Sequence, residues 1–148
     1  MLKKYLLMFF ILLPVLAFAQ TASELDAMLQ ADTVTAAGAA RFVLGAADLL
    51  PAGVSGVDAE NAAYDIAGSK GWIKAAASDA VTLKDTAFLI MKAFNLKGGV
   101  MYSIFKNPRY AYREMIYQKN IMGQTDQGMK VSGSGLLAIL GRVMRSEE

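Results

Sequence analysis

A stretch that occurs twice constrains this chain more than any other feature. DTVTAAGAARFVLGAADL, residues 32–49, has a counterpart in DAVTLKDTAFLIMKAFNL, residues 79–96, at an offset of 47 positions. The identical positions are Asp32/Asp79, Val34/Val81, Thr35/Thr82, Ala40/Ala87, Ala46/Ala93 and Leu49/Leu96. A weaker copy, VSGSGLLAILGRV, covers residues 131–143. Because alanine-rich stretches align easily by chance, this similarity needs support from elsewhere in the chain.

A second pair of stretches follows the first pair in the same order. AYDIAGSKGWI, residues 63–73, and AYREMIYQKNI, residues 111–121, share their opening Ala-Tyr and their closing Ile at an offset of 48. Fixed offsets of this size are the sequence signature of a repeat architecture. The sequence therefore predicts repeats at about 32–78 and 79–128, followed by a half-repeat at about 129–145.

Each repeat is predicted to open with a long helix. In every copy a hydroxyl residue follows a Val and can cap the helix that begins there; these residues are Thr35, Thr82 and Ser132. After Thr82 the apolar residues recur at helical spacing, on one face made of Leu83, Ala87, Ile90 and Phe94. Phe88, Leu89 and Met91 widen this face. A helix this apolar is expected to be covered on most sides, at the centre of the core.

Shorter helices are predicted at about 59–67, from Pro108 to about Lys119, and in a leading segment from Ser23 to Gln30. Pro108 suits the first turn of a helix. The Gly- and Pro-containing segments 51–58 and 97–108 are predicted as loops. Since strand-like alternation is scarce, the predicted fold class is all-α, built from repeated helix–loop–helix units packed as a small bundle.

The first twenty residues differ from the rest. Lys3 and Lys4 precede an apolar run from Tyr5 to Leu16, and Ala17-Phe18-Ala19 places small residues where a signal peptidase reads. The alternative is a transmembrane anchor, which needs roughly 20 apolar residues, more than this run contains. We therefore expect a cleaved signal peptide at 1–19, a leading segment at 20–31 and a helical domain at 32–148. The mature protein is expected in the periplasm or at the cell surface, without a transmembrane segment.

The chain contains neither cysteine nor histidine. Disulfides, thiol nucleophiles, the usual zinc-ligand sets and the commonest general base are therefore excluded. No phosphate loop or dinucleotide fingerprint is present. We expect no catalytic residues, no cofactor and no metal. The weaker alternative is an enzyme that uses carboxylates such as Asp79 and Asp85 in a groove between repeats.

Charge is distributed unevenly along the chain. Residues 20–91 hold four basic and nine acidic residues, whereas residues 92–148 hold nine basic and four acidic ones. This imbalance indicates either an anionic partner for the C-terminal half or attraction between the two halves or between neighbouring copies. Both interpretations stay open at the level of the sequence.

The stretch FKNPRYAYREMIYQK, residues 105–119, combines cationic and aromatic side chains. Arg and Tyr are typical of interfaces and of carbohydrate or anion recognition, because stacking and forked hydrogen bonds act at low entropic cost. On a helix, Arg109, Tyr112 and Arg113 are expected along one side. The predicted binding residues are Lys106, Arg109, Tyr110, Tyr112, Arg113 and Tyr117. The alternative is that the tyrosines pack in the core and the arginines are solvated beyond them.

The repeats resemble the S-layer homology family. The long helix of that family typically starts Ile-Thr-Arg-Ala-Glu and the short one ends Gly-Ile-Ile-x-Gly; here the openings are VTAAG, VTLKD and VSGSG, and the closings are KGWI and KNIMG. The resemblance covers roughly residues 32–144. It implies a three-pronged helical bundle that holds an anionic cell-wall polysaccharide in the grooves between prongs. The family's arginine takes part in that contact, but Ala36, Leu83 and Gly133 stand at the matching positions here.

Together these features predict a non-catalytic, exported cell-envelope protein. It would bind a wall polymer or an envelope protein through a scaffold similar to that of the S-layer homology family. The alternative is a structural subunit that self-assembles as a homo-oligomer or docks onto a larger periplasmic or surface assembly. Nucleic acid is not expected as a partner of an exported protein.

Overall fold

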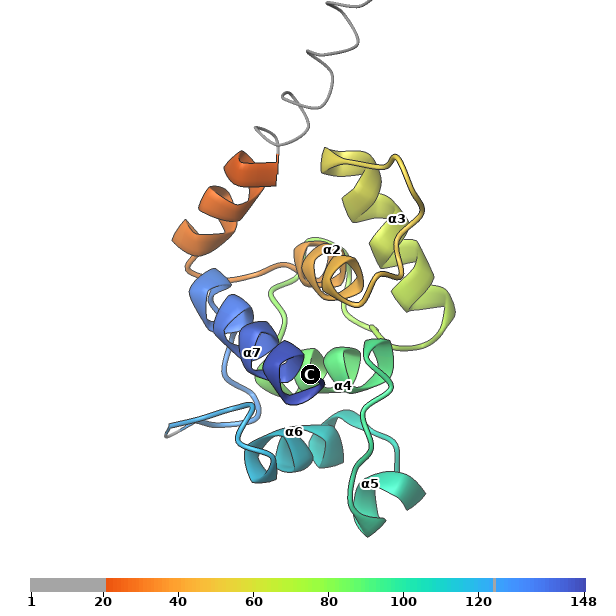
Figure 1. Cartoon of the computed structure of the whole chain (residues 1–148), viewed down its shortest axis with the longest axis vertical. Coiled ribbons are helices and arrows are strands. Elements are labelled where there is room, and N and C mark those ends of the chain that lie inside the picture. Colours follow the sequence, from red (N-terminus) through yellow and green to blue (C-terminus); the bar gives the residue numbers. More distant parts are fainter. Residues whose placement is uncertain (1–20, 124) are drawn as a thin grey trace, which may run out of the picture.

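The computed structural model describes residues 21–123 and 125–148, and its secondary structure is helical (Figure 1). Residues 21–30 are helical, and they are followed by α2 (Ala36–Ala46), α3 (Gly56–Ser69), α4 (Leu83–Ala93), α5 (Val100–Ile104), α6 (Pro108–Tyr117) and α7 (Gly133–Ser146). Within these residues there is no strand, only isolated bridges between Thr35 and Ala80 and between Thr82 and Lys130. The prediction of an all-α fold is confirmed. The predicted signal peptide, residues 1–19, lies outside the described residues.

Three of the helices begin with the same capping geometry. The side-chain oxygen of Thr35 accepts a hydrogen bond from Gly38 N at 3.1 Å, at the start of α2. At the start of α4, Thr82 Oγ1 accepts from Asp85 N at 3.3 Å while its hydroxyl donates to Asp85 Oδ2 at 2.6 Å. Ser132 accepts from Gly135 N at 3.1 Å at the start of α7. Each cap satisfies one of the donors that a helix N-terminus leaves unpaired.

The valines that precede these caps are joined in a closed ring of backbone hydrogen bonds. Val81 N donates to Val34 O at 2.9 Å, Val131 N donates to Val81 O at 3.2 Å, and Val34 N donates to Val131 O at 2.8 Å. All three side chains are buried. Three further hydrogen bonds join the first residue of each helix to a neighbouring segment: Ala36 N donates to Asp79 O, Leu83 N to Met129 O and Gly133 N to Ala31 O. These six backbone hydrogen bonds hold the starts of α2, α4 and α7 together.

The core is organised around α4. Its buried residues are Leu83, Thr86, Ala87, Phe88, Leu89, Ile90 and Met91. It packs against α6 on one side and α2 on another, and α2 packs mainly against α3. The wide apolar face of this helix is therefore covered on most sides, as its sequence predicts.

The helix boundaries differ from the predicted ones at three places. α3 begins at Gly56, earlier than expected, and α6 ends at Tyr117, because Lys119 turns the chain with a positive φ of 62°. A short helix, α5, lies in the segment predicted as a loop. Five residues are too few to show a helical period in sequence, so α5 could not be recognised from the pattern.

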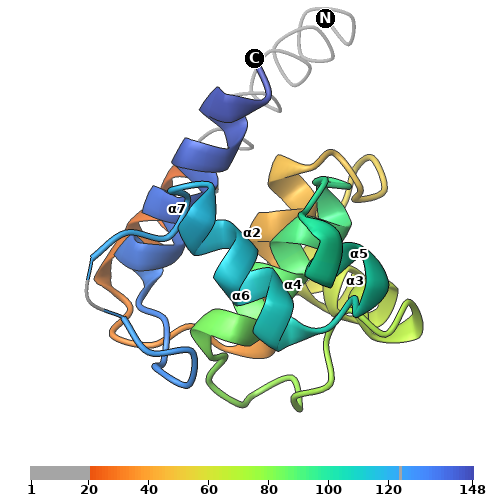
Figure 2. The same cartoon turned by 90° about the horizontal axis from the view of Figure 1, so that it is seen from below.

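The helix formed by residues 21–30 lies beside α7 in both views (Figures 1 and 2). The backbone of Met28 approaches the start of α7 so closely that a Cβ atom added to Gly133 would lie 1.5 Å from Met28 O. Gly133 is therefore required where this helix meets α7. Among residues 21–123 and 125–148, no helix combines the length and the apolar character needed to cross a membrane.

Candidate functional site

The cationic residues predicted for binding lie on the surface of α6 and the segment before it. Lys106, Arg109 and Arg113 are exposed, and Tyr117 is 83% exposed. Tyr110 is half-buried, and its ring stacks on that of Phe105 with centroids 5.8 Å apart. These side chains do not line a common pocket; they are spread over an open surface.

The expectation for Tyr112 is wrong. Its side chain is buried, and its hydroxyl bonds to the carbonyl oxygen of Thr125 at 2.9 Å and to Thr125 Oγ1 at 2.8 Å. The buried stripe of α6 consists of Ala111, Tyr112 and Met115, so Tyr112 turns inward while Arg109 and Arg113 on either side turn outward. Tyr112 ties α6 to the loop that leads to α7 and is not available to a ligand.

A groove that the sequence did not indicate lies between residues 21–30, α2 and the start of α3. Its volume is about 420 Å³. Most of its lining is apolar, contributed by Ala27, Met28, Ala31, Val34, Phe42 and Val57. Its charged lining residues are Glu24, Arg41 and Glu60. We call this the Arg41 groove.

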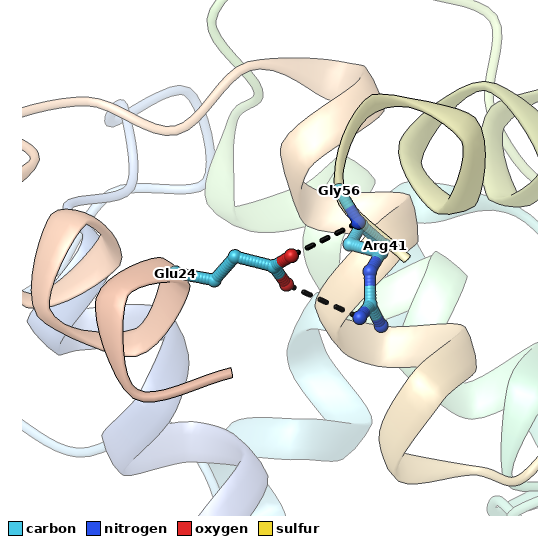
Figure 3. A network of polar contacts seen from close by, with 3 residues as sticks. All are labelled: Glu24, Arg41 and Gly56. Carbon is cyan, nitrogen blue, oxygen red and sulfur yellow. Dashed lines mark hydrogen bonds and ion pairs between the residues drawn. The ribbon is translucent and has the colours of Figure 1, made fainter. Parts of the chain in front are cut away.

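Glu24 joins the three elements of the Arg41 groove (Figure 3). Its Oε2 lies 3.2 Å from Arg41 Nη2 on α2, and its Oε1 accepts a hydrogen bond from Gly56 N at the start of α3 at 3.0 Å. The side chains of Arg41 and Glu24 are only 22% and 27% exposed. Because removing charges from water is costly, a pair this buried needs good geometry and further hydrogen bonds to be stable.

Arg41 retains unused hydrogen-bonding capacity. Its Nε is buried and has no partner in the described part of the chain. A guanidinium offers five N–H donors in a planar fork, which suits carboxylates and vicinal hydroxyls, and the apolar walls beside it suit the face of a ring. The groove therefore places the Arg41 guanidinium, held by Glu24, beside apolar walls.

A signal for Arg41 is present in the sequence. It is the only basic residue between Lys4 and Lys70, and it interrupts an apolar run between Ala40 and Phe42. A single charge within a helix that is otherwise apolar is expected to have a partner. What the sequence does not contain is the identity of that partner, since Glu24 is seventeen positions away on another helix.

The other residues singled out from the sequence are the helix caps and the carboxylates Asp79 and Asp85. Thr35, Thr82 and Ser132 use their oxygens to cap helices. Asp85 lines a cavity of only about 40 Å³ with Trp72 and Pro108, and its carboxylate is bonded to Thr82. Asp79 is exposed. Over residues 21–123 and 125–148, no group of His, Cys, Asp or Glu is arranged to hold a metal ion.

Comparison with known proteins finds no relative: no family model, no curated protein and no solved structure matches this chain.

Proposed function

We propose that this chain is a non-catalytic cell-envelope protein that binds an acidic wall polysaccharide in the Arg41 groove. Its scaffold would be a three-fold arrangement of helical pairs similar to that of the S-layer homology family. The predicted signal peptide would bring the protein to the compartment where such polymers occur.

The ring of hydrogen bonds between Val34, Val81 and Val131 supports the three-fold arrangement. Each valine precedes a capped helix, and each follows another helix: α3 leads to Val81, α6 leads to Val131, and residues 21–30 lead to Val34. Under this proposal, residues 21–30 supply the second helix of the half-repeat at 129–145. The third repeat would thus be completed by the chain's own N-terminal segment, which lies beside α7.

The observation that carries the binding proposal is the partly buried Arg41 guanidinium, which lines an apolar groove. Glu24 neutralises the guanidinium and Glu60 also lines the groove, so an acidic sugar would bind Arg41 only with Glu24 displaced or reoriented. The apolar walls formed by Met28, Phe42 and Val57 offer surfaces for sugar rings. Arg41 would thereby take the role of the arginine that the family carries at the position of Ala36.

Retention of the protein on purified wall polysaccharide tests this proposal. Arg41→Gln removes the charge and should weaken binding on the order of 10- to 100-fold, the range for loss of a charge-assisted hydrogen bond. Arg113→Gln, an exposed arginine on α6, is the matched control and should bind like the wild type. Circular dichroism must show both variants folded. Equal retention of the two variants would refute the assignment of the groove, and retention only by envelope protein extract would identify a protein partner instead.

A structural subunit is the second candidate function, favoured by the separation of charge along the chain. The exposed cations of the second half, among them Lys97, Lys106, Arg109 and Arg113, form no ion pair within the described residues; the ion pair found there joins Arg41 and Glu24. Copies could therefore pair acidic with basic surfaces. Light scattering at low and high salt tests this, because such assemblies dissociate when salt screens the charges. A monomer under both conditions would rule out self-assembly.

A further inference from the structure

Four neighbouring apolar residues are exposed on α5 and at Phe105, the residue that follows it and whose ring also stacks on Tyr110. Their exposed fractions are 74% for Val100, 47% for Met101, 64% for Ile104 and 50% for Phe105. On a helix these positions fall within one side, since residues four apart lie above one another. We call this cluster the α5 tip. A contiguous exposed apolar patch on a small domain usually marks a surface that contacts another phase or partner.

Contacts with the core and with α6 fix the position of α5. Tyr102, on the opposite side of α5, is buried in the core, and a Cβ atom at Gly98 would lie only 2.5 Å from its ring. Gly99 N donates a hydrogen bond to Glu114 Oε2 of α6 at 2.9 Å, and Gln118 Nε2 donates to Lys97 O at 2.9 Å. These contacts anchor both the start of α5 and the segment before it, so that its apolar residues stay directed outward.

Basic residues predominate in the sequence around α5. Between Asp85 and Glu114 the chain contains no acidic residue, and its cations there are Lys92, Lys97, Lys106, Arg109 and Arg113. Three of these, Lys92, Lys97 and Lys106, line a groove of about 350 Å³ that also includes Tyr102 and Ser103 of α5. Glu114, the nearest acid in sequence, is already bonded to Gly99 N and Gln118 Nε2. An anionic group in this groove would meet three lysines, while the carboxylates nearby are that of Glu114, at the start of α5, and that of Glu147, which lines a neighbouring groove with Lys97.

We infer that the α5 tip and the groove lined by Lys92, Lys97 and Lys106 form a docking surface for an anionic lipid membrane. The apolar side chains would enter the boundary between headgroups and acyl chains, and the lysines would contact lipid phosphates. Figure 1 shows α5 at the periphery of the molecule, beyond α4 and α6 and far from residues 21–30, where a flat surface can reach it. An anionic bilayer uses both the cations and the four exposed apolar groups. The docking surface shares no residue with the Arg41 groove, so a test of membrane binding is independent of a test of polysaccharide binding.

Vesicle binding by an environment-sensitive fluorophore tests the insertion of the tip. The chain has no cysteine, so Ile104→Cys creates a unique attachment site, and Met129→Cys, at an exposed position before α7, is the control. Mixed phosphatidylcholine–phosphatidylglycerol vesicles should increase and blue-shift the emission of the Ile104→Cys conjugate only. Pure phosphatidylcholine vesicles should have little effect, and high salt should reverse the change, because it screens the attraction between cations and lipid. No shift at position 104 with anionic vesicles would overturn the inference.

Flotation of otherwise unlabelled variants tests the two parts of the surface. Ile104→Ser combined with Phe105→Ser, and separately Lys97→Glu combined with Lys106→Glu, should each reduce binding to the anionic vesicles. For the lysines the reduction should be on the order of fivefold per residue or more, given the attraction of one cation to an anionic leaflet. Lys74→Glu combined with Arg145→Glu makes the same change in net charge at exposed positions elsewhere and should have a much smaller effect. Any affinity of residues 1–20 for lipid is common to all variants. Equal flotation of all of them would refute the assignment, and α5 would then be a contact for another protein.

Discussion

Gly133 is the position at which the smallest change should have a large effect. It is the first residue of α7, and the backbone of Met28 lies directly against it. In Gly133→Ala the new Cβ would be 1.5 Å from Met28 O, whereas real Cβ atoms essentially never approach another heavy atom closer than 3.0 Å. Residues 21–30 would have to retreat from α7 by about 1.5 Å or more.

This retreat has two costs. Inserting an atom into a well-packed contact costs about 1–3 kcal/mol, and the hydrogen bond from Gly133 N to Ala31 O, 2.9 Å long, would be lost or strained at a further cost of about 1 kcal/mol. Replacing a helical glycine by alanine gains at most about 1 kcal/mol, because alanine loses less backbone entropy. The net loss of unfolding free energy is therefore about 1–3 kcal/mol, which lowers Tm by roughly 4–12 °C for a domain of this size.

Gly141→Ala provides the matched control. Gly141 lies in the same helix and is exposed, and a Cβ atom added there meets nothing within 4 Å. This substitution should stabilise the protein by about 0.5–1 kcal/mol through helix propensity alone. Thermal and urea unfolding followed by circular dichroism measures both variants. If Gly133→Ala is as stable as Gly141→Ala, the close packing of residues 21–30 on α7 is wrong.

Two further predictions concern α4 and α5. The hydroxyl of Thr86 is buried in α4 and has no hydrogen-bond partner among the described residues. Thr86→Val, of equal shape, should therefore raise the free energy of unfolding by about 1 kcal/mol, and the same change at exposed Thr33 should have little effect. A destabilised Thr86→Val variant would mean that the hydroxyl does have a partner. Burial raises the pKa of Tyr102 above its ordinary value of 10.0, because the phenolate loses hydration. The unfolded state then releases this proton at a lower pH than the folded state, so the contribution of Tyr102 to stability is complete below pH 10 and falls as the pH rises above it. Unfolding curves between neutral pH and about pH 11 should show a smaller decline for Tyr102→Phe than for the wild type, and parallel curves would exclude this linkage.

Features that depend on neighbouring residues could be predicted from the sequence. A hydroxyl side chain before a helical run caps it through a bond only three residues away, and Thr35, Thr82 and Ser132 all do so. Likewise, the apolar residues of α4 recur so densely that the helix had to be covered on most sides. These interactions are local, so the order of residue types contains nearly all the information they require.

The tertiary structure alone decided how these pieces are joined and which side chains remain available. Whether Tyr112 faces a ligand or Thr125 depends on the rotation of α6 against its neighbours, and the partner of Arg41 depends on where residues 21–30 come to lie. The hydrogen bonds that join the starts of α2, α4 and α7 connect backbone groups about 50 to 100 positions apart. Nearly every residue has the same backbone donor and acceptor, so the residue types do not reveal which groups will pair. Residue order therefore determined where helices form and which faces are apolar, while packing between distant segments determined the grooves and exposed surfaces on which function depends.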